Sequence, residues 1–165
     1  NKTPTEHGAI PIDPYSHTPA HAGAQQPGMT GLVKEELLIR RAELGVIARD
    51  GALEFDSTFL STTEMLSNPR SWDLMDISLA TREIRLPAVS LGLTVCQVPI
   101  VVSLTEGPTH VEVEFALGRA LTIAGTSLGP DLSRKVFDRT GEITRVRAFI
   151  PGSEVPSAVT EQPSL

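Results

Sequence analysis

HVEVEFAL, residues 110–117, alternates apolar and polar side chains more regularly than any other part of the chain. The odd-numbered positions are all large and apolar, whereas His110, Glu112 and Glu114 occupy even-numbered positions. Successive side chains of an extended chain point to opposite sides, so this period of two predicts a β-strand with one buried face and one solvated face.

Further stretches of this kind follow Asp76, at Ile77–Leu86, Leu93–Leu104, Ala120–Ala124 and Ile143–Ile150. In the second of them we expect a kink at Pro99, and we expect Cys96 to be a small, inert core residue. Turn-forming residues separate the stretches, at Gly107-Pro108, Gly118, Gly125, Gly129-Pro130 and Thr140-Gly141. Short strands at this spacing predict a mainly β fold, an antiparallel β-sandwich-like domain over residues 46–150.

One amphipathic α-helix is expected before this domain, over residues 30–45. The hydroxyl of Thr30 suits the N-cap, because it can accept a hydrogen bond from a free N–H group of the first turn. Gly45 supplies the left-handed residue that ends many helices. The apolar stripe of the helix consists of Val33, Leu37 and Leu44, widened by Leu38.

The rest of the chain is less regular. Asp50-Gly51 predicts the turn of a small hairpin over Val46–Phe55, whereas residues 56–75 carry mixed signals and are assigned to neither helix nor strand. Residues 151–165 are rich in Pro, Ser and Glu and are expected to form a flexible tail. Residues 1–29 hold prolines and glycines together with hydrogen-bonding side chains, so both an ordered loop and a flexible tether remain open.

Composition and charge exclude several classes of function. A length of 165 residues fits one soluble domain, and a net charge of −6 is unsuited to nucleic acid or to an anionic membrane surface. No apolar run reaches the ~20 residues of a membrane span. The single cysteine rules out an internal disulfide and fits the cytoplasm, although an exported protein without disulfides fits equally. Because the chain begins at Asn1, without methionine or a signal-like segment, we expect a piece of a larger protein.

The candidate ligand site is the loop that leads into the helix. A helix N-terminus presents free N–H groups and a partial positive charge, which suit an anion. Imidazoles and amides just upstream could hydrogen-bond sugar hydroxyls or a phosphate. The predicted sugar- or anion-binding residues are His17, His21, Gln25, Gln26, Thr30 and Gly31. The alternative is that Thr30 only caps the helix and the glycines only turn the chain.

Catalytic and metal sites have little support in the sequence. His17 and His21 have a metal-ligand spacing, but Pro19 and Gly23 interrupt the helix that would place them on one face, so we expect no metal and no cofactor. Glu35 and Glu36 are neighbours on a helix and point in different directions, so they cannot act as a carboxylate pair. Motifs for a nucleophile or for nucleotide binding do not occur in the sequence.

Three motifs in succession are similar to a known family: Gly28-Met29-Thr30-Gly31 before the helix, Glu43-Leu44-Gly45-Val46 at its end, and Asp50-Gly51 in the hairpin. With the β-rich remainder they resemble the C-terminal portion of six-hairpin, (α/α)6-barrel glycoside hydrolases and phosphorylases. In that family a Thr-Gly loop opens a late barrel helix, and a C-terminal β-sandwich follows. In the phosphorylases this pair holds phosphate, a role that would fall to Thr30 and Gly31. Leu32 departs from the family pattern, which has an aromatic residue there.

The resemblance implies an upstream helical-barrel domain, or a partner chain, that would supply the acid and base carboxylates. The favoured hypothesis is therefore the C-terminal segment of a carbohydrate-active enzyme, not catalytic by itself. The alternative is a freestanding, non-catalytic β-sandwich module for binding or interaction. Residues 1–29 ordered against a large exposed apolar patch on the helix would favour the first hypothesis. Flexible residues 1–29, with the helix fully packed on its own sheet, would favour the second.

Overall fold

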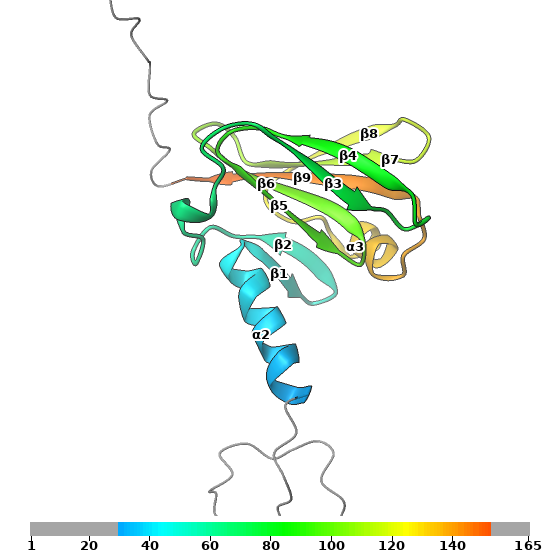
Figure 1. The fold of residues 1–165 in the computed structure, drawn as a ribbon, viewed down its shortest axis with the longest axis horizontal. Helices are drawn as coiled ribbons and strands as arrows, with labels where there is room; N and C mark the ends of the chain where they lie inside the picture. Colours follow the sequence, from blue (N-terminus) through cyan, green and yellow to red (C-terminus); the bar gives the residue numbers. More distant parts are fainter. Residues whose placement is uncertain (1–29, 153–165) are drawn as a thin grey trace, which may run out of the picture. The chain divides into compact units, whose positions relative to one another are not determined.

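The structure is a computed structural model that describes residues 30–152, with side chains from residue 35 onward (Figure 1). The chain divides between Arg40 and Arg41 into two units, and all strands of the described residues belong to the second. The helices are α2 (Thr30–Glu43), the short 3-10 helix η1 (Thr62–Glu64) and α3 (Pro130–Phe137). The strands are β1 (Val46–Arg49), β2 (Ala52–Phe55), β3 (Arg70–Met75), β4 (Thr81–Leu86), β5 (Ser90–Val95), β6 (Val98–Thr105), β7 (His110–Phe115), β8 (Ala120–Ala124) and β9 (Ile143–Pro151).

A five-stranded sheet with the order β5-β6-β9-β7-β8 organises the second unit. Neighbouring strands within this sheet run antiparallel, except for β6 and β9, which run parallel to each other. A parallel pair needs a long crossover connection, and here β7, β8 and α3 lie between the two strands in sequence. β9, the last strand of the described residues, thus lies at the centre of the sheet, between β6 and β7.

The main hydrophobic core covers one face of this sheet. Its side chains are almost all aliphatic, among them Val98, Ile100, Val102, Val111, Val113, Val146, Ala148 and Ile150. The β1–β2 hairpin contributes Leu53 and Phe55 and α3 contributes Val136, so these elements form a layer on the sheet. The backbone N–H of Leu53 donates to Ser133 Oγ over 2.8 Å, which ties β2 to α3.

The opposite face is covered at its β5–β6 end by the β3–β4 hairpin, which lies on the other side of the sheet from the β1–β2 hairpin (Figure 1). This smaller cluster consists of Leu74, Ile84, Leu86 and Val101, with Leu66 and Trp72 at its border. Gly92 permits the close approach, because a Cβ atom there would lie 2.9 Å from the ring of Trp72.

The mainly β fold with an amphipathic helix before it is confirmed. The helix begins at Thr30 and ends at Glu43, Gly45 has the expected positive φ of 78°, and the hairpin with Asp50-Gly51 at its turn is present. Four of the five predicted strands match β4, β7, β8 and β9 within a few residues. In addition, β3 occupies part of the unassigned stretch 56–75, and β9 extends to Pro151, the first residue of the predicted tail. Residues 1–29 and 153–165 lie outside the described part of the chain.

The expectation for Leu93–Leu104 was wrong, because this stretch is not one kinked strand but two strands joined by a tight turn. Cys96 and Gln97 form the turn with φ of 50° and 66°, the left-handed conformation that two-residue hairpins favour. Cys96 is therefore exposed and is not a core residue. Pro99 is tolerated without a kink, because the pairing of β6 with β9 begins only at Ile100.

Helix α3 was not predicted, although its sequence carries helix signals. Pro130 stands in its first turn with Asp131, and Arg134 and Lys135 stand in its last turn. These are the positions at which proline and charges of each sign suit a helix and its dipole. Gly129 and Pro130 were interpreted only as a turn because eight residues are too few to show a helical period clearly.

Candidate functional site

Most of the predicted ligand site cannot be located in the fold. His17, His21, Gln25 and Gln26 lie outside the described residues, and Thr30 and Gly31 are the first two residues of α2, before its described side chains. The anion- or sugar-binding loop therefore stays a prediction.

The described part of α2 has one notable property, which is exposed apolar surface. Leu37, Leu38 and Ile39 are 57%, 58% and 60% exposed. Glu35 and Glu36 are exposed as well, as expected for solvated carboxylates. Leu37 and Leu38 of the predicted apolar stripe are thus exposed, whereas Leu44, its last member, packs against the main core. Large contiguous apolar surfaces usually mark an interaction site.

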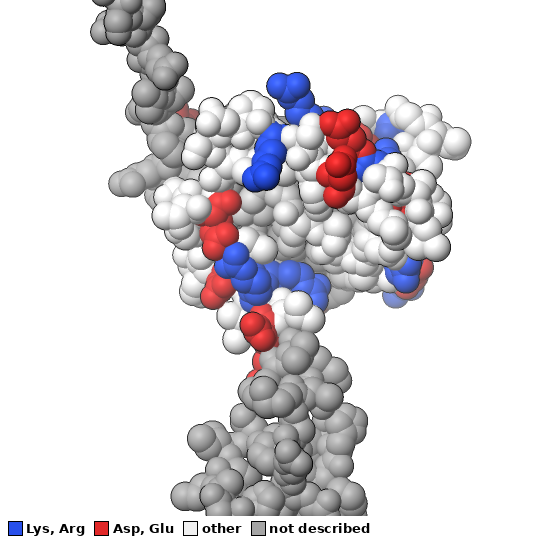
Figure 2. Space-filling view, in the orientation of Figure 1, with Lys and Arg blue, Asp and Glu red and all other residues white. Residues whose placement is uncertain are grey.

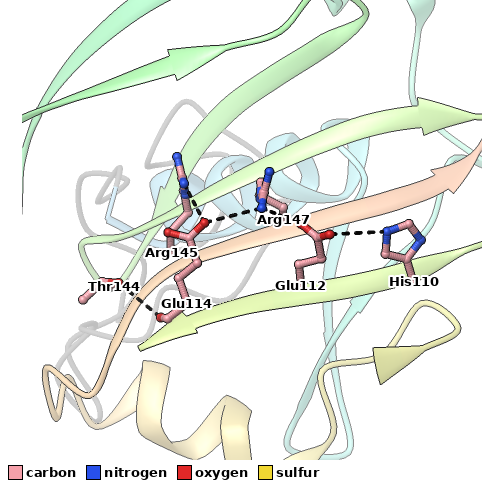
Figure 3. Close-up of polar contacts among 6 residues, drawn as sticks. All are labelled: His110, Glu112, Glu114, Thr144, Arg145 and Arg147. Carbon is pink, nitrogen blue, oxygen red and sulfur yellow. Dashed lines mark hydrogen bonds and ion pairs between the residues drawn. The ribbon is translucent and has the colours of Figure 1, made fainter. Parts of the chain in front are cut away.

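The densest polar cluster of the described chain lies on the sheet face opposite the main core, on β7 and β9. The charged ladder, as we call it, consists of Glu112, Glu114, Arg145 and Arg147. Strand register produces it, because Glu112 lies opposite Arg147 and Glu114 lies opposite Arg145. All four side chains project to one side of the two strands, away from α3 (Figure 3).

Each carboxylate of the charged ladder has a guanidinium partner. Arg145 Nη2 lies 2.5 Å from Glu114 Oε1, and Arg147 Nη2 lies 2.7 Å from Glu112 Oε2. Arg147 also reaches Glu114 at 3.5 Å, which links the two pairs. The side chains are between 26% and 41% exposed, so solvent and salt partly screen these pairs.

His110, two positions before Glu112 on the same face of β7, adds one more polar residue beside the charged ladder. Its Nδ1 lies 2.9 Å from the carbonyl oxygen of Pro108, and a carbonyl only accepts hydrogen bonds, so Nδ1 carries a proton. Its ring stacks on Phe149 with 4.3 Å between centroids and 12° between planes. His110 is therefore half-buried rather than an exposed strand residue, and its Nε2 lies 3.8 Å from Glu112.

The charged ladder is suited to holding strands together and not to acid–base catalysis. Two catalytic carboxylates must differ in protonation, with one kept neutral at working pH. Glu112 and Glu114 instead both form ion pairs with arginines of the neighbouring strand β9. The ladder carries two charges of each sign and is neutral in sum, so it also has no excess charge with which to attract an ion.

Among the described side chains of residues 35–152, two carboxyl groups outside the charged ladder have clearly shifted pKa values, and both shifts are downward. The hydroxyl of Thr58 is the main cause of the lowered pKa of Asp56, and the hydroxyl of Ser78 is the main cause of the lowered pKa of Asp76. In each case the donor is two residues on, the geometry of a local turn. A general acid needs the opposite shift, so neither group is a candidate for that role.

Other site classes can be considered for residues 30–152. Within this range there is no cluster of three or more His, Cys, Asp or Glu side chains that could hold a metal ion. Nor does any helix in it have the length and apolar character needed to cross a membrane. Lys and Arg side chains lie interspersed with Asp and Glu on the face of the β-domain shown in Figure 2.

Comparison with known proteins leaves the family open: no protein-family model matches the sequence, and no curated protein does either.

The charged ladder was missed at the level of sequence, although a signal for it exists. Two alternating strands carry opposite charges on their polar faces, Glu112 and Glu114 in one and Arg145 and Arg147 in the other. Opposite charges favour cross-strand pairing. The pairing of β7 with β9 could not be predicted from the sequence, because β8 and α3 lie between the two strands along the chain and several other strands could have paired with either.

Proposed function

We propose that this chain is the C-terminal segment of a carbohydrate-active enzyme of the glycosidase or glycoside phosphorylase kind. The β-domain would brace an upstream helical barrel, and the loop that precedes α2 would contribute contacts to a sugar or phosphate. The observation that carries the proposal is the exposed apolar surface of α2 at Leu37, Leu38 and Ile39.

A surface of this kind favours a helix that belongs to a larger helical assembly. Burying apolar area contributes roughly 25 cal/mol per Å², so three large side chains left in water forgo several kcal/mol. Only Leu44 and Gly45 separate α2 from β1. Leu44 packs against the main core and Val46 is 2% exposed within it, so the chain that leaves the helix is anchored in the β-domain. In the resembled family, the late barrel helix and the sandwich follow each other in the same way.

The chemistry of the described β-domain is consistent with a supporting role. Its densest polar cluster, the charged ladder, is internally neutralised, and its two clearly shifted carboxyl pKa values are lowered. A pair of catalytic carboxylates would then come from the upstream barrel, and residues 15–31 would supply ligand contacts from this chain.

Titration of the isotope-labelled full chain with inorganic phosphate, and then with a panel of oligosaccharides, tests this proposal. We expect the amide signals of Thr30 and Gly31 to shift with phosphate but not with chloride at equal ionic strength. Thr30→Val should weaken this response at least about fivefold, because charge-assisted hydrogen bonds are the stronger ones, whereas the matched Thr62→Val on η1 should leave it unchanged. No response at either amide, with or without the upstream domain, contradicts the ligand part of the proposal.

The second candidate is a freestanding, non-catalytic β-sandwich module for binding or interaction. It is favoured by the completeness of the β-domain, whose main core has its own covering layer of β1, β2 and α3. Under this alternative, Leu38→Lys on α2 would change neither solubility nor association. Under the favoured proposal, the same change would prevent assembly with the upstream domain, whereas Glu36→Lys would not.

A further inference from the structure

Strand β8 forms an edge of the five-stranded sheet that the described chain does not cover. Among residues 30–152, its strand neighbour is β7 alone, and of Ala120 to Ala124 all but Ile123 are exposed. The sequence ALTIA contains no charge and no proline, the two devices that most often protect an edge from pairing with another strand.

The other edge, β5, differs in this respect. The N–H of Leu66 donates to the carbonyl of Ser90 over 2.9 Å, and the N–H of Val89 donates to Leu66 over 2.8 Å, so a loop pairs with the start of β5. Trp72 lies against Gly92 on its outer face. Within residues 30–152, β8 is thus the edge that is open to a new strand.

The backbone of β8 presents its free groups in a fixed pattern. Gly125 N–H donates to Thr109 and Phe115 N–H donates to Arg119, at the two ends of the β7–β8 pair. Between these ends, antiparallel pairing alternates, so odd-numbered residues of β8 turn their N–H and C=O groups toward β7. The even-numbered residues Ala120, Thr122 and Ala124 turn theirs outward.

This pattern is self-complementary. If a second copy of β8 runs antiparallel with Thr122 facing Thr122, then Ala120 faces Ala124 and Leu121 faces Ile123. The outward N–H and C=O groups of Ala120, Thr122 and Ala124 then all find hydrogen-bond partners. In an antiparallel pair, two opposed residues whose N–H and C=O groups point at each other exchange two hydrogen bonds. Side chains of matched size meet at every position.

Burial of apolar side chains also favours this pairing. Leu121 pairs with the core residue Val113 on β7 and so points to the core side of the sheet, yet it is 41% exposed. A second copy would place Ile123 beside it, and the two main cores would join at the edge. Charges do not oppose this, because Arg119 would face Gly125 and the nearest carboxylates, Glu112 and Glu114, are paired with arginines.

We propose that two copies of this chain pair antiparallel along β8, about a twofold axis at Thr122, and join their sheets into one continuous sheet. The same patch serves both copies, as a twofold interface requires. A single short strand buries less than the roughly 1,200 Å² of a standard stable interface. The dimer is therefore weak and depends on concentration.

Sedimentation equilibrium of the full chain over a range of concentrations tests the proposal. The wild type should approach twice the monomer mass at high concentration. Thr122→Lys should raise the dimer dissociation constant at least about tenfold, because two lysines would face each other on the axis. In the monomer that lysine lies beside Glu112, its neighbour on β7, so folding is preserved. Thr94→Lys, the same change on β5, should dimerise as the wild type does.

A disulfide test fixes the register. In a Cys96→Ser background, Thr122→Cys should crosslink on mild oxidation, since facing Cα atoms lie about 5.5 Å apart, within disulfide range. Ala120→Cys should not, because its copy lies at least about 13 Å away along the strand. A wild type that stays monomeric at every concentration overturns the proposal. So does unchanged dimerisation of Thr122→Lys with an unaltered circular dichroism spectrum, which would place another surface, such as α2, in the interface.

Discussion

The two halves of the outer sheet face are built from the same strands in continuous register but have opposite character. One cross-strand row contains Gly92, Val101, Arg147, Glu112 and Thr122, from β5 to β8. Its first two residues lie under the β3–β4 hairpin, where Val101 is 2% exposed. Its next two residues form an ion pair, and the last is an exposed polar residue. A single row therefore passes from covered to open within five strands.

The side chains of this face confine the covering β3–β4 hairpin to one half of it. A hairpin packs where the sheet offers glycine and valine, because little side-chain volume or polarity must be displaced. It does not extend over the charged ladder, because paired charges would lose solvation beneath it. The open half of the face is consequently the half that leads to the free edge at β8.

The largest loss of stability should come from a substitution in the half that the β3–β4 hairpin covers. Ile84→Ala removes a side chain that is 5% exposed beneath the hairpin, and should cost about 3 kcal/mol of unfolding free energy, by loss of burial and creation of a cavity. Urea unfolding followed by the fluorescence of Trp72, the single tryptophan, measures it. Arg85→Ala, on the exposed side of the same strand, should stay within about 0.5 kcal/mol. Equal losses in the two variants would mean that the hairpin does not pack on the sheet.

A smaller loss of stability is expected from a substitution in the open half, which carries the charged ladder. Glu112→Gln breaks the partly exposed pair with Arg147 and should cost about 0.5–1 kcal/mol at low salt, falling as salt is added. A double-mutant cycle with Arg147→Met isolates the pair energy from the effects of each single change. Glu106→Gln, in the exposed loop after β6, is the matched control. A loss that does not depend on salt would show that the ladder acts through packing.

The smallest effect concerns the turn that closes the covering hairpin. Asp76 has a lowered folded-state pKa because Ser78 hydrogen-bonds its carboxylate, so its contribution to stability is present above the ordinary carboxyl pKa and is lost as pH falls through the folded-state pKa. Ser78→Ala should raise the pKa of Asp76 toward its ordinary value, measured by carboxyl NMR titration. Thr58→Ala should do the same for Asp56 and leave Asp76 unchanged. A titration of Asp76 that is unaltered by Ser78→Ala would contradict the assigned cause.

Local patterns predicted much of this fold. The alternation in residues 110–117 gave β7, the capping and stripe residues gave α2, and Asp50-Gly51 gave the first hairpin. The tight turn at Cys96 was missed because neither Cys96 nor Gln97 is a residue that favours a positive φ. The candidate ligand residues at the start of α2 and in the loop before it stay predictions.

The sequence by itself determined strands β4, β7, β8 and β9 and the apolar face of β7, because these properties depend on side chains that lie close together along the chain. Apart from the β1–β2 hairpin, which Asp50-Gly51 predicted, tertiary structure alone decided which strands are neighbours. The parallel placement of β9 between β6 and β7, the pairing of Glu112 with Arg147 and the open edge at β8 all depend on contacts between residues that are distant in sequence. Such contacts are selected by the packing of the whole chain around one core, so a local pattern does not specify them.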